Sequence, residues 1–197
     1  MLVSGIKSRP KYATLEPDPF AIFNLVLVEG EGAGAAARLL ESADHQFRTK
    51  TTVLYSGSSQ AADCVSSFQI HRMQFLPTIE TLLIRLDGFL TTATMGIRLY
   101  AAGTEGFIGQ VIQHAEQFFI DHKSIITEHC GSLARRIQCV HCKGITENVT
   151  TNVARCGHCG VNLLVRDHYS RRFAAFMGVS TDAEAPGVLP PIQEVFR

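Results

Sequence analysis

The sequence predicts an α/β fold, in which a five-stranded parallel doubly wound sheet is followed by a small four-cysteine zinc ribbon and a C-terminal helix and tail. Three observations lead to this prediction. Apolar and β-branched runs alternate with helix-forming segments between residues 22 and 127, which is typical of a parallel sheet covered on both faces. Two C-x-x-C motifs follow between residues 139 and 159. The chain has 197 residues, 46% of them hydrophobic, enough for one sizeable core and a small accessory module.

The five predicted strands differ in character. Residues 22–28 are apolar almost throughout, as in a central parallel strand. A glycine turn at 30–34 leads into an alanine-rich helix over 35–41. The other predicted strands are residues 51–55, 68–75, 96–103 and 124–127.

Two further helices are expected between these strands. The first covers residues 78–87, directly after Pro77, and its apolar face consists of Ile79, Leu82, Leu83 and Leu86. The second covers residues 105–119, and its inward side chains are expected to be Phe107, Ile108, Val111, Ile112, Ala115 and Phe119.

The strand ends could form a nucleotide site, because ligands of open α/β sheets bind at the carboxyl ends of the strands. The candidate residues are the turn glycines and the glycine that ends the fourth strand: Gly30, Gly32, Gly34 and Gly103. Two observations weaken this interpretation. Glu29 and Glu31 would repel a pyrophosphate, and the turn lacks the G-x-G-x-x-G pattern. A packed turn without a ligand is the favoured interpretation.

Four cysteines predict a tetrahedral metal site. Cys139 and Cys142 form one C-x-x-C motif and Cys156 and Cys159 form the other, with thirteen residues between the motifs. Each motif lets two thiolates from one turn bind the same ion. Because the connection is short, a structural zinc is favoured, and a rubredoxin-type iron is the alternative. Two further cysteines, Cys64 and Cys130, are expected to be small buried residues.

The segment after the second motif is expected to continue as a strand and then a helix, with Asp167 as the N-cap. The basic side chains of this helix are candidates for docking a partner, and a solvated basic face is the alternative. These candidates are Arg166, His168, Arg171 and Arg172.

Four regions follow from these assignments. Residues 1–20, with three prolines, are expected to form an extended arm, and residues 21–134 the α/β domain. Residues 135–179 are expected to form the rubredoxin-like cysteine domain with its exit helix. Residues 180–197 form a tail without a core of its own, of the kind that often folds onto a partner.

Composition restricts the location and the partners. The start of the chain resembles no signal peptide, and no apolar run reaches the roughly 18 residues needed to span a bilayer. We therefore expect a cytoplasmic protein without membrane contact. The formal net charge is zero, and residues 135–172 carry a net charge of +5 (7 Lys and Arg minus 2 Asp and Glu). Without aromatics interleaved among these charges, we expect no nucleic-acid binding.

The α/β part resembles the nucleotide-binding half of the ferredoxin reductase superfamily. The matching landmarks are the glycine turn at 30–34, the strand end at 53–55 and the segment 99–104. Two positions depart from that pattern, because Ala102 stands where the family has cysteine and Thr104 where it has proline. No segment is long enough for the flavin-binding barrel. The resemblance implies a reductase domain that lacks its redox groups.

The cysteine motifs, with the segment 163–179 behind them, resemble the small A subunit of bacterial dimethylamine monooxygenase. This resemblance implies a multi-subunit, NADPH- and O2-dependent enzyme that converts dimethylamine to methylamine and formaldehyde. It also implies that haem, flavin and an iron–sulfur cluster lie on partners, namely a haem-containing oxygenase subunit and a reductase subunit. We expect this chain to be a non-catalytic accessory subunit. The alternatives are an electron-transfer subunit with iron at the cysteines, or an NAD(P)H-binding component.

Overall fold

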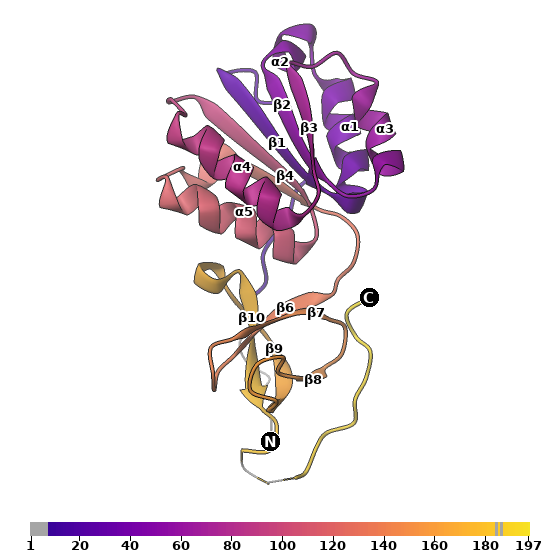
Figure 1. The fold of residues 1–197 in the computed structure, drawn as a ribbon, viewed down its shortest axis with the longest axis vertical. Helices are drawn as coiled ribbons and strands as arrows, with labels where there is room; N and C mark the ends of the chain where they lie inside the picture. Colours follow the sequence, from indigo (N-terminus) through magenta and orange to yellow (C-terminus); the bar gives the residue numbers. More distant parts are fainter. Residues whose placement is uncertain (1–7, 184, 186) are drawn as a thin grey trace. The chain divides into compact units, whose positions relative to one another are not determined.

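The computed structural model describes residues 8–183, 185 and 187–197 and divides into two compact units (Figure 1). The α/β unit consists of residues 12–131. The C-terminal unit consists of the described residues from 132 to 197 together with residues 8–11. The first seven residues of the predicted arm, and Glu184 and Pro186 of the tail, lie outside the described residues.

The α/β unit contains the predicted five-stranded sheet, which is entirely parallel. Its strand order is β3-β2-β1-β4-β5. The strands are β1 (Phe23–Glu29), β2 (Thr51–Ser56), β3 (Arg72–Leu76), β4 (Ile97–Gly103) and β5 (Ile125–His129). The α-helices are α1 (Ala33–Ser42), α2 (His45–Thr49), α3 (Ser59–Ser66), α4 (Ile79–Thr91) and α5 (Glu105–Gln117). Two short 3-10 turns are η1 (Gly30–Gly32) and η2 (His122–Ser124). The predicted doubly wound parallel sheet is confirmed.

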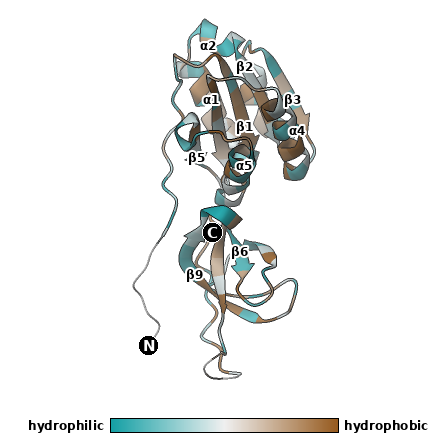
Figure 2. Ribbon diagram, turned by 90° about the vertical axis from the view of Figure 1, so that its left-hand side faces the viewer, coloured by the Kyte–Doolittle hydropathy of each residue, from teal (hydrophilic) through white to brown (hydrophobic). Residues whose placement is uncertain are grey.

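The central strands are apolar on both faces because helices cover both faces. Val26 and Val28 of β1 belong to an apolar cluster with α1 and α3. The alternate residues Leu25 and Leu27 belong to a second cluster with α4 and α5. Figure 2 shows these strands as the most hydrophobic part of the unit. The continuous apolar run in the sequence thus reflects two cores separated by one sheet.

Helix starts agree with local capping rules. Thr78 caps α4 in a capping box with Thr81, directly after Pro77. Thr104 caps α5, its hydroxyl accepting from the amide of Phe107.

The inward face of α5 is confirmed except at its end. Phe119 is 96% exposed and has a positive φ of 57°, so the chain leaves the helix before this residue.

Local signals missed three details of this unit. The third strand begins at Arg72 instead of residue 68, and the helices α2 and α3 were not predicted. Asp44 caps α2 and Ser58 caps α3, so side-chain caps for both helices were present in the sequence. Cys64 on α3 is exposed, so the expectation that it is buried was wrong.

The segment before β1 runs along the outer edge of β5. The amide of Ala13 donates to Thr127 O (3.0 Å), and the amide of Leu15 donates to the Glu128 carboxylate (2.8 Å). Asp18 then accepts from Arg98 (2.5 Å). Residues 12–18 therefore cover this edge of their own sheet.

The C-terminal unit contains a second five-stranded sheet with the order β7-β6-β10-β9-β8. Its strands are β6 (Arg135–Cys139), β7 (Ile145–Val149), β8 (Val153–Arg155), β9 (Asn162–Ser170) and β10 (Ala175–Ser180). A 3-10 turn, η3 (Arg171–Phe173), joins β9 to β10.

The predicted helix after Asp167 was wrong, because residues 162–170 form the strand β9. Leu163, Val165 and Tyr169 of this strand contribute to the core of the unit, which is the period of a strand. Asp167 does not cap a helix and instead pairs with Arg135 of β6 (2.7 Å). Strand pairing and this ion pair therefore stabilise the strand conformation of residues 162–170, although the local sequence weakly favours a helix.

The described part of the tail pairs with its own unit. Asn152 N donates to Gln193 O (3.0 Å), and Val195 N and Phe196 N both donate to Thr150 O (2.9 Å). At the other end of the chain, Ser8 N donates to Asp167 O (2.9 Å). Both ends of the chain thus extend the second sheet.

Candidate functional site

The four cysteines of the two motifs come together in one cluster. Their sulfur atoms all lie within 4.8 Å of one another. The Sγ atoms of Cys139 and Cys159 are 3.8 Å apart, and those of Cys142 and Cys156 are 3.7 Å apart. A tetrahedral ion with metal–sulfur bonds of about 2.3 Å requires sulfurs about 3.8 Å apart. The residues therefore fit a four-thiolate metal site.

Two similar turns place the sulfurs. In the first, Lys143 N donates to Cys139 O (2.9 Å), and in the second, Gly160 N donates to Cys156 O (3.1 Å). The residue after each second cysteine has a positive φ, 64° at Lys143 and 75° at Gly160. The reversal of the backbone turns amide groups toward sulfur, and Gly144 N donates to the Cys142 Sγ (3.4 Å). The two C-x-x-C motifs therefore adopt the same turn conformation.

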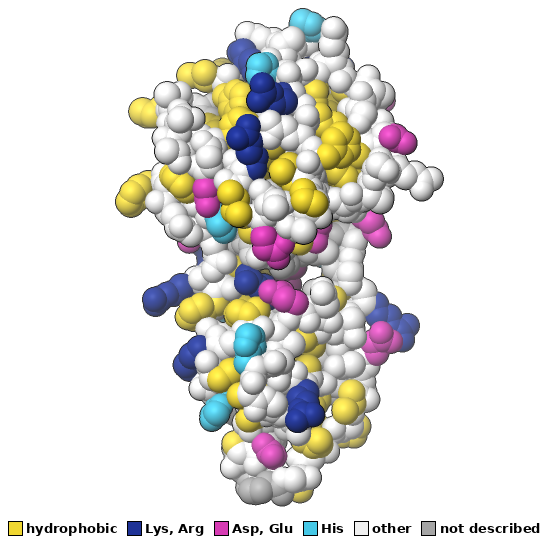
Figure 3. Space-filling view, in the orientation of Figure 1, with side chains coloured by type: hydrophobic (Ala, Val, Ile, Leu, Met, Phe, Trp, Pro, Cys, Tyr) yellow, Lys and Arg dark blue, Asp and Glu magenta, His cyan; other side chains and the backbone are white. Residues whose placement is uncertain are grey.

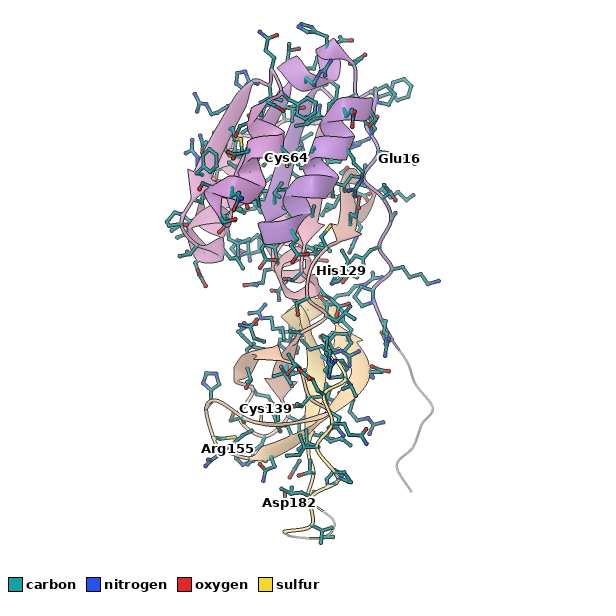
Figure 4. The ribbon with its side chains drawn as sticks, turned by 90° about the vertical axis from the view of Figure 1, so that its right-hand side faces the viewer. Glu16, Cys64, His129, Cys139, Arg155 and Asp182 are labelled. Atoms are coloured by element: carbon teal, nitrogen blue, oxygen red, sulfur yellow. The ribbon has the colours of Figure 1, made fainter. Side chains whose placement is uncertain are left out.

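The cluster is buried on one side only. Cys139 and Cys156 are buried, whereas Cys142 and Cys159 are exposed. The Arg155 guanidinium donates to Gly160 O (3.2 Å) and so stabilises the second turn. Figure 4 shows Arg155 and Cys139 in the same unit. The His158 imidazole lies 2.8 Å from Ile145 O, which gives this ring a backbone partner outside the cluster.

The thiols of Cys156 and Cys159 have different pKa values, although the two sulfurs belong to the same cluster. The amide of Cys159, followed by the amide of His158, lowers the pKa of Cys156 to about 6 despite the opposing effect of burial. The amide of Val161 acts to lower the pKa of Cys159. Burial and the neighbouring cysteines outweigh it and raise that pKa to about 12. Because like charges repel, sulfurs this close do not all become thiolates unless a cation lies between them.

The glycine turn at the carboxyl end of β1 is tightly packed. A Cβ on Gly32 would lie 2.3 Å from Ala102 O, so the turn lies directly against the end of β4. Gly103 has a φ of 156°, and a Cβ there would lie 2.8 Å from the Glu29 Cβ. The Glu29 carboxylate accepts from the amide (2.9 Å) and the hydroxyl (2.6 Å) of Thr104. Packing between strand ends accounts for these two glycines.

The remaining glycine candidates differ. Gly30 has a φ of 48° and open space around the position of a Cβ. Gly34 would meet only the Arg38 guanidinium, at 3.8 Å. In the first turn of α1, Gly34 is exposed, whereas Ala33, Ala35 and Ala36 are buried.

The basic docking candidates lie on two elements. Arg166 and His168 are on β9, and Arg171 and Arg172 are on η3. They belong to a strand and a turn instead of the predicted helix.

Sequence reasoning missed a buried ionic network. Arg135, 5% exposed, lies between the rings of Phe176 and Phe196, 3.8 Å from each centroid. Its guanidinium pairs with Asp167, which also pairs with Arg9 (2.6 Å). Burial acts to raise the pKa of Asp167, but hydrogen bonds from the two arginines outweigh it, so the pKa is lowered. No local motif marks partners this distant in sequence.

The chain thus combines a parallel α/β domain with a second domain whose four clustered cysteines could bind a metal ion. The chain belongs to the family described as dimethylamine monooxygenase subunit DmmA-like, since the N-terminal domain model matches residues 4–125 and the C-terminal domain model matches residues 136–179. A relative from Ectopseudomonas mendocina (strain ymp), named heme-dependent oxidative N-demethylase delta subunit, is 32% identical over 116 residues. The match spans 58% of this chain and 66% of that relative.

Two solved structures are similar to part of this chain. The ferredoxin reductase in carbazole 1,9a-dioxygenase is 13% identical with a TM-score of 0.46, over 59% of this chain and 35% of that one. A siderophore interacting protein from Acinetobacter baumannii is 13% identical with a TM-score of 0.47, over 63% of this chain and 50% of that one. Within the described residues, no helix has the length and apolarity to cross a membrane.

Proposed function

We propose that this chain is an accessory, non-catalytic subunit of a multi-subunit dimethylamine monooxygenase, an NADPH- and O2-dependent enzyme that yields methylamine and formaldehyde. Family membership and the relative's name, a delta subunit of an oxidative N-demethylase, support this proposal. Its partners are a haem-containing oxygenase subunit and a reductase subunit, which carry the haem, the flavin and the iron–sulfur cluster. It acts in the cytoplasm.

The observation that carries the accessory role is the closed cysteine cluster. Four sulfurs fill a tetrahedron, so a bound ion keeps no position for a substrate or water. We propose zinc, which would supply a structural cross-link between the two turns. Cys139 and Cys142 hold it from one side, and Cys156 and Cys159 from the other. We assign partner contacts to Arg166, His168, Arg171 and Arg172 on the same unit.

Co-expression tests this function. The chain should co-purify with the other subunits at a fixed stoichiometry, and the complex should oxidise dimethylamine with NADPH and O2. Omitting this chain should reduce assembly without changing the spectra of the haem and flavin in the subunits that carry them. A complex that assembles and turns over equally well without this chain would contradict the proposal.

An iron-dependent electron-transfer role is the second candidate, favoured by the exposure of Cys142 and Cys159. Electron transfer requires an accessible edge of the metal site, and these two sulfurs provide one. Elemental analysis and a visible spectrum of the purified chain separate the candidates. One colourless zinc per chain supports the structural role, whereas stoichiometric iron with thiolate charge-transfer bands supports electron transfer.

An NAD(P)H-binding role is the third candidate, favoured by the strand order and by the exposed Gly34 in the first turn of α1. The carboxylates of Glu29 and Glu31 oppose it electrostatically. Titration of the chain with NADPH decides the question. Micromolar affinity for NADPH, weakened by Gly34→Asp, would support binding at this turn. The absence of saturable binding would exclude the NAD(P)H-binding role.

A further inference from the structure

The two edges of the parallel sheet differ. Residues 12–18 cover the outer edge of β5 through backbone and side-chain hydrogen bonds. Among the described residues, no strand and no backbone hydrogen bond covers the outer edge of β3, since this strand pairs only with β2. An uncovered edge presents backbone donors and acceptors that can pair with a further strand.

β3 also lacks two of the features that usually block such pairing, a proline and a bulge. It contains no proline, and its register with β2 is continuous from Arg72 to Leu76, without a bulge. One exposed aromatic, Phe75, is 56% accessible on this strand. On the neighbouring helix α4, Ile84 is 69% accessible. The edge therefore combines free backbone groups with exposed apolar side chains.

Two arginines, Arg72 and Arg85, lie at this edge. Arg72 is the first residue of β3, and His71 directly precedes it. The His71 amide donates to Arg48 O, which places the backbone of Arg48 next to the start of β3. Arg85 of α4 donates to the Gln74 side chain (2.8 Å). Figure 3 shows Lys, Arg and His side chains gathered among hydrophobic ones over the part of the unit that holds β2, β3 and α4.

The two carboxylates of α4 already have partners. A backbone hydrogen bond within the first turn, followed by one from Thr78, lowers the pKa of Glu80, so its charge serves the helix start. Asp87 pairs with His114 of α5 (2.8 Å). At the edge itself, the described charged side chains of β3 and of the part of α4 bonded to it are Arg72 and Arg85, and their charge suits a negatively charged ligand.

We infer that the free edge of β3 pairs with an extended, acidic segment of another subunit of the oxygenase complex. Such strand addition takes affinity from main-chain hydrogen bonds and specificity from side chains on both faces. Arg72 and Arg85 attract the carboxylates of the segment, and Phe75 and Ile84 receive its apolar side chains. This inference rests on the proposed function, because it requires a partner subunit.

Hydrogen–deuterium exchange of the chain, free and in the co-purified complex, tests the inference. The amides of residues 72–76 that point away from β2 should exchange at least tenfold more slowly in the complex, whereas those of residues 125–129 should change little. The double variant Arg72→Glu and Arg85→Glu should weaken binding to the other subunits at least tenfold. Lys123→Glu, a single charge reversal just before the opposite edge strand β5, should leave the affinity within twofold, whereas Arg72→Glu alone should weaken it. Thermal unfolding of each variant alone verifies that the fold is retained.

The outcomes separate this inference from the proposed function. If the complex forms but residues 72–76 exchange equally fast in both states, the β3 interface is overturned and the subunit role stands. If the chain alone is a dimer with protected β3 amides, the occupant is a second copy, which overturns the inference. If the chain binds no other subunit, both the proposed function and the inference fail.

Discussion

The two units of this chain are stabilised by different means. The α/β unit has two apolar clusters, one on each face of its sheet, built from complete helices and strands. The C-terminal unit has one small cluster of six buried residues: Ile137, Cys139, Val149, Cys156, Leu163 and Phe176. Two of these six, Cys139 and Cys156, belong to the four-cysteine cluster. A domain with so small a core depends on cross-links, here the sulfur cluster and the ion pairs of Asp167.

The comparison predicts different failures in the two units. Loss of a metal ligand should unfold only the C-terminal unit, whereas a core cavity should weaken only the α/β unit. The changes that follow test this separation.

The largest effect is expected for Cys139→Ser. Structural zinc sites supply about 10 kcal/mol or more to the folding of small domains. The variant should lose its metal and the slow amide exchange of residues 135–180, while residues 23–129 stay protected. Metal analysis and amide exchange measure both effects. Cys64→Ser, at an exposed cysteine outside the cluster, is the control and should keep the metal. Loss of protection in both units would contradict independent stabilisation.

A smaller effect is expected for Leu39→Ala in α1. Leu39 is fully buried, and truncating a buried leucine costs about 3 kcal/mol. The unfolding midpoint of the α/β unit should fall, with the metal content unchanged. Ile84→Ala, at an exposed position, should change the unfolding free energy by less than about 0.5 kcal/mol. Metal loss in Leu39→Ala would show that the units fold as one.

Asp167→Asn should destabilise the C-terminal unit by about 2 kcal/mol near neutral pH, because Arg135 would keep a buried charge without its carboxylate. The pKa of Asp167 is lowered in the folded state, so its contribution is present above the unfolded pKa of about 3.9. The contribution is lost as the pH falls through the folded pKa. Urea unfolding of both proteins, followed by amide exchange of residues 135–180, should show a difference at pH 7 that shrinks below about pH 4. A difference independent of pH would assign the effect to packing instead of charge.

The smallest effect is expected for Lys143→Gly, which should stabilise the C-terminal unit. A non-glycine residue at positive φ costs about 1–2 kcal/mol, and glycine loses about 0.5–1 kcal/mol in extra backbone entropy, so the gain is about 0.5 kcal/mol. Gly160→Ala, at the matching place in the second turn, should have the opposite sign. Denaturant midpoints of the metal-bound proteins measure both changes. Equal signs would contradict the equivalence of the two turns.

The sequence by itself determined the parallel sheet and the sulfur cluster. The apolar run of β1 and the apolar face of α4 are local patterns, and each C-x-x-C motif sets its turn within a few residues. The parallel sheet and the convergence of the four cysteines could therefore be anticipated without distant contacts.

Only the tertiary structure decided the course of the chain after the second motif. Residues 162–170 carry signals for both a strand and a helix, and pairing with β8 and β10 selects the strand. Arg135, Asp167 and Phe196 meet although they are far apart in sequence. The free edge of β3 likewise depends on which strands find partners elsewhere. Such choices depend on long-range pairing and burial, whose free energies exceed the small differences between local conformations.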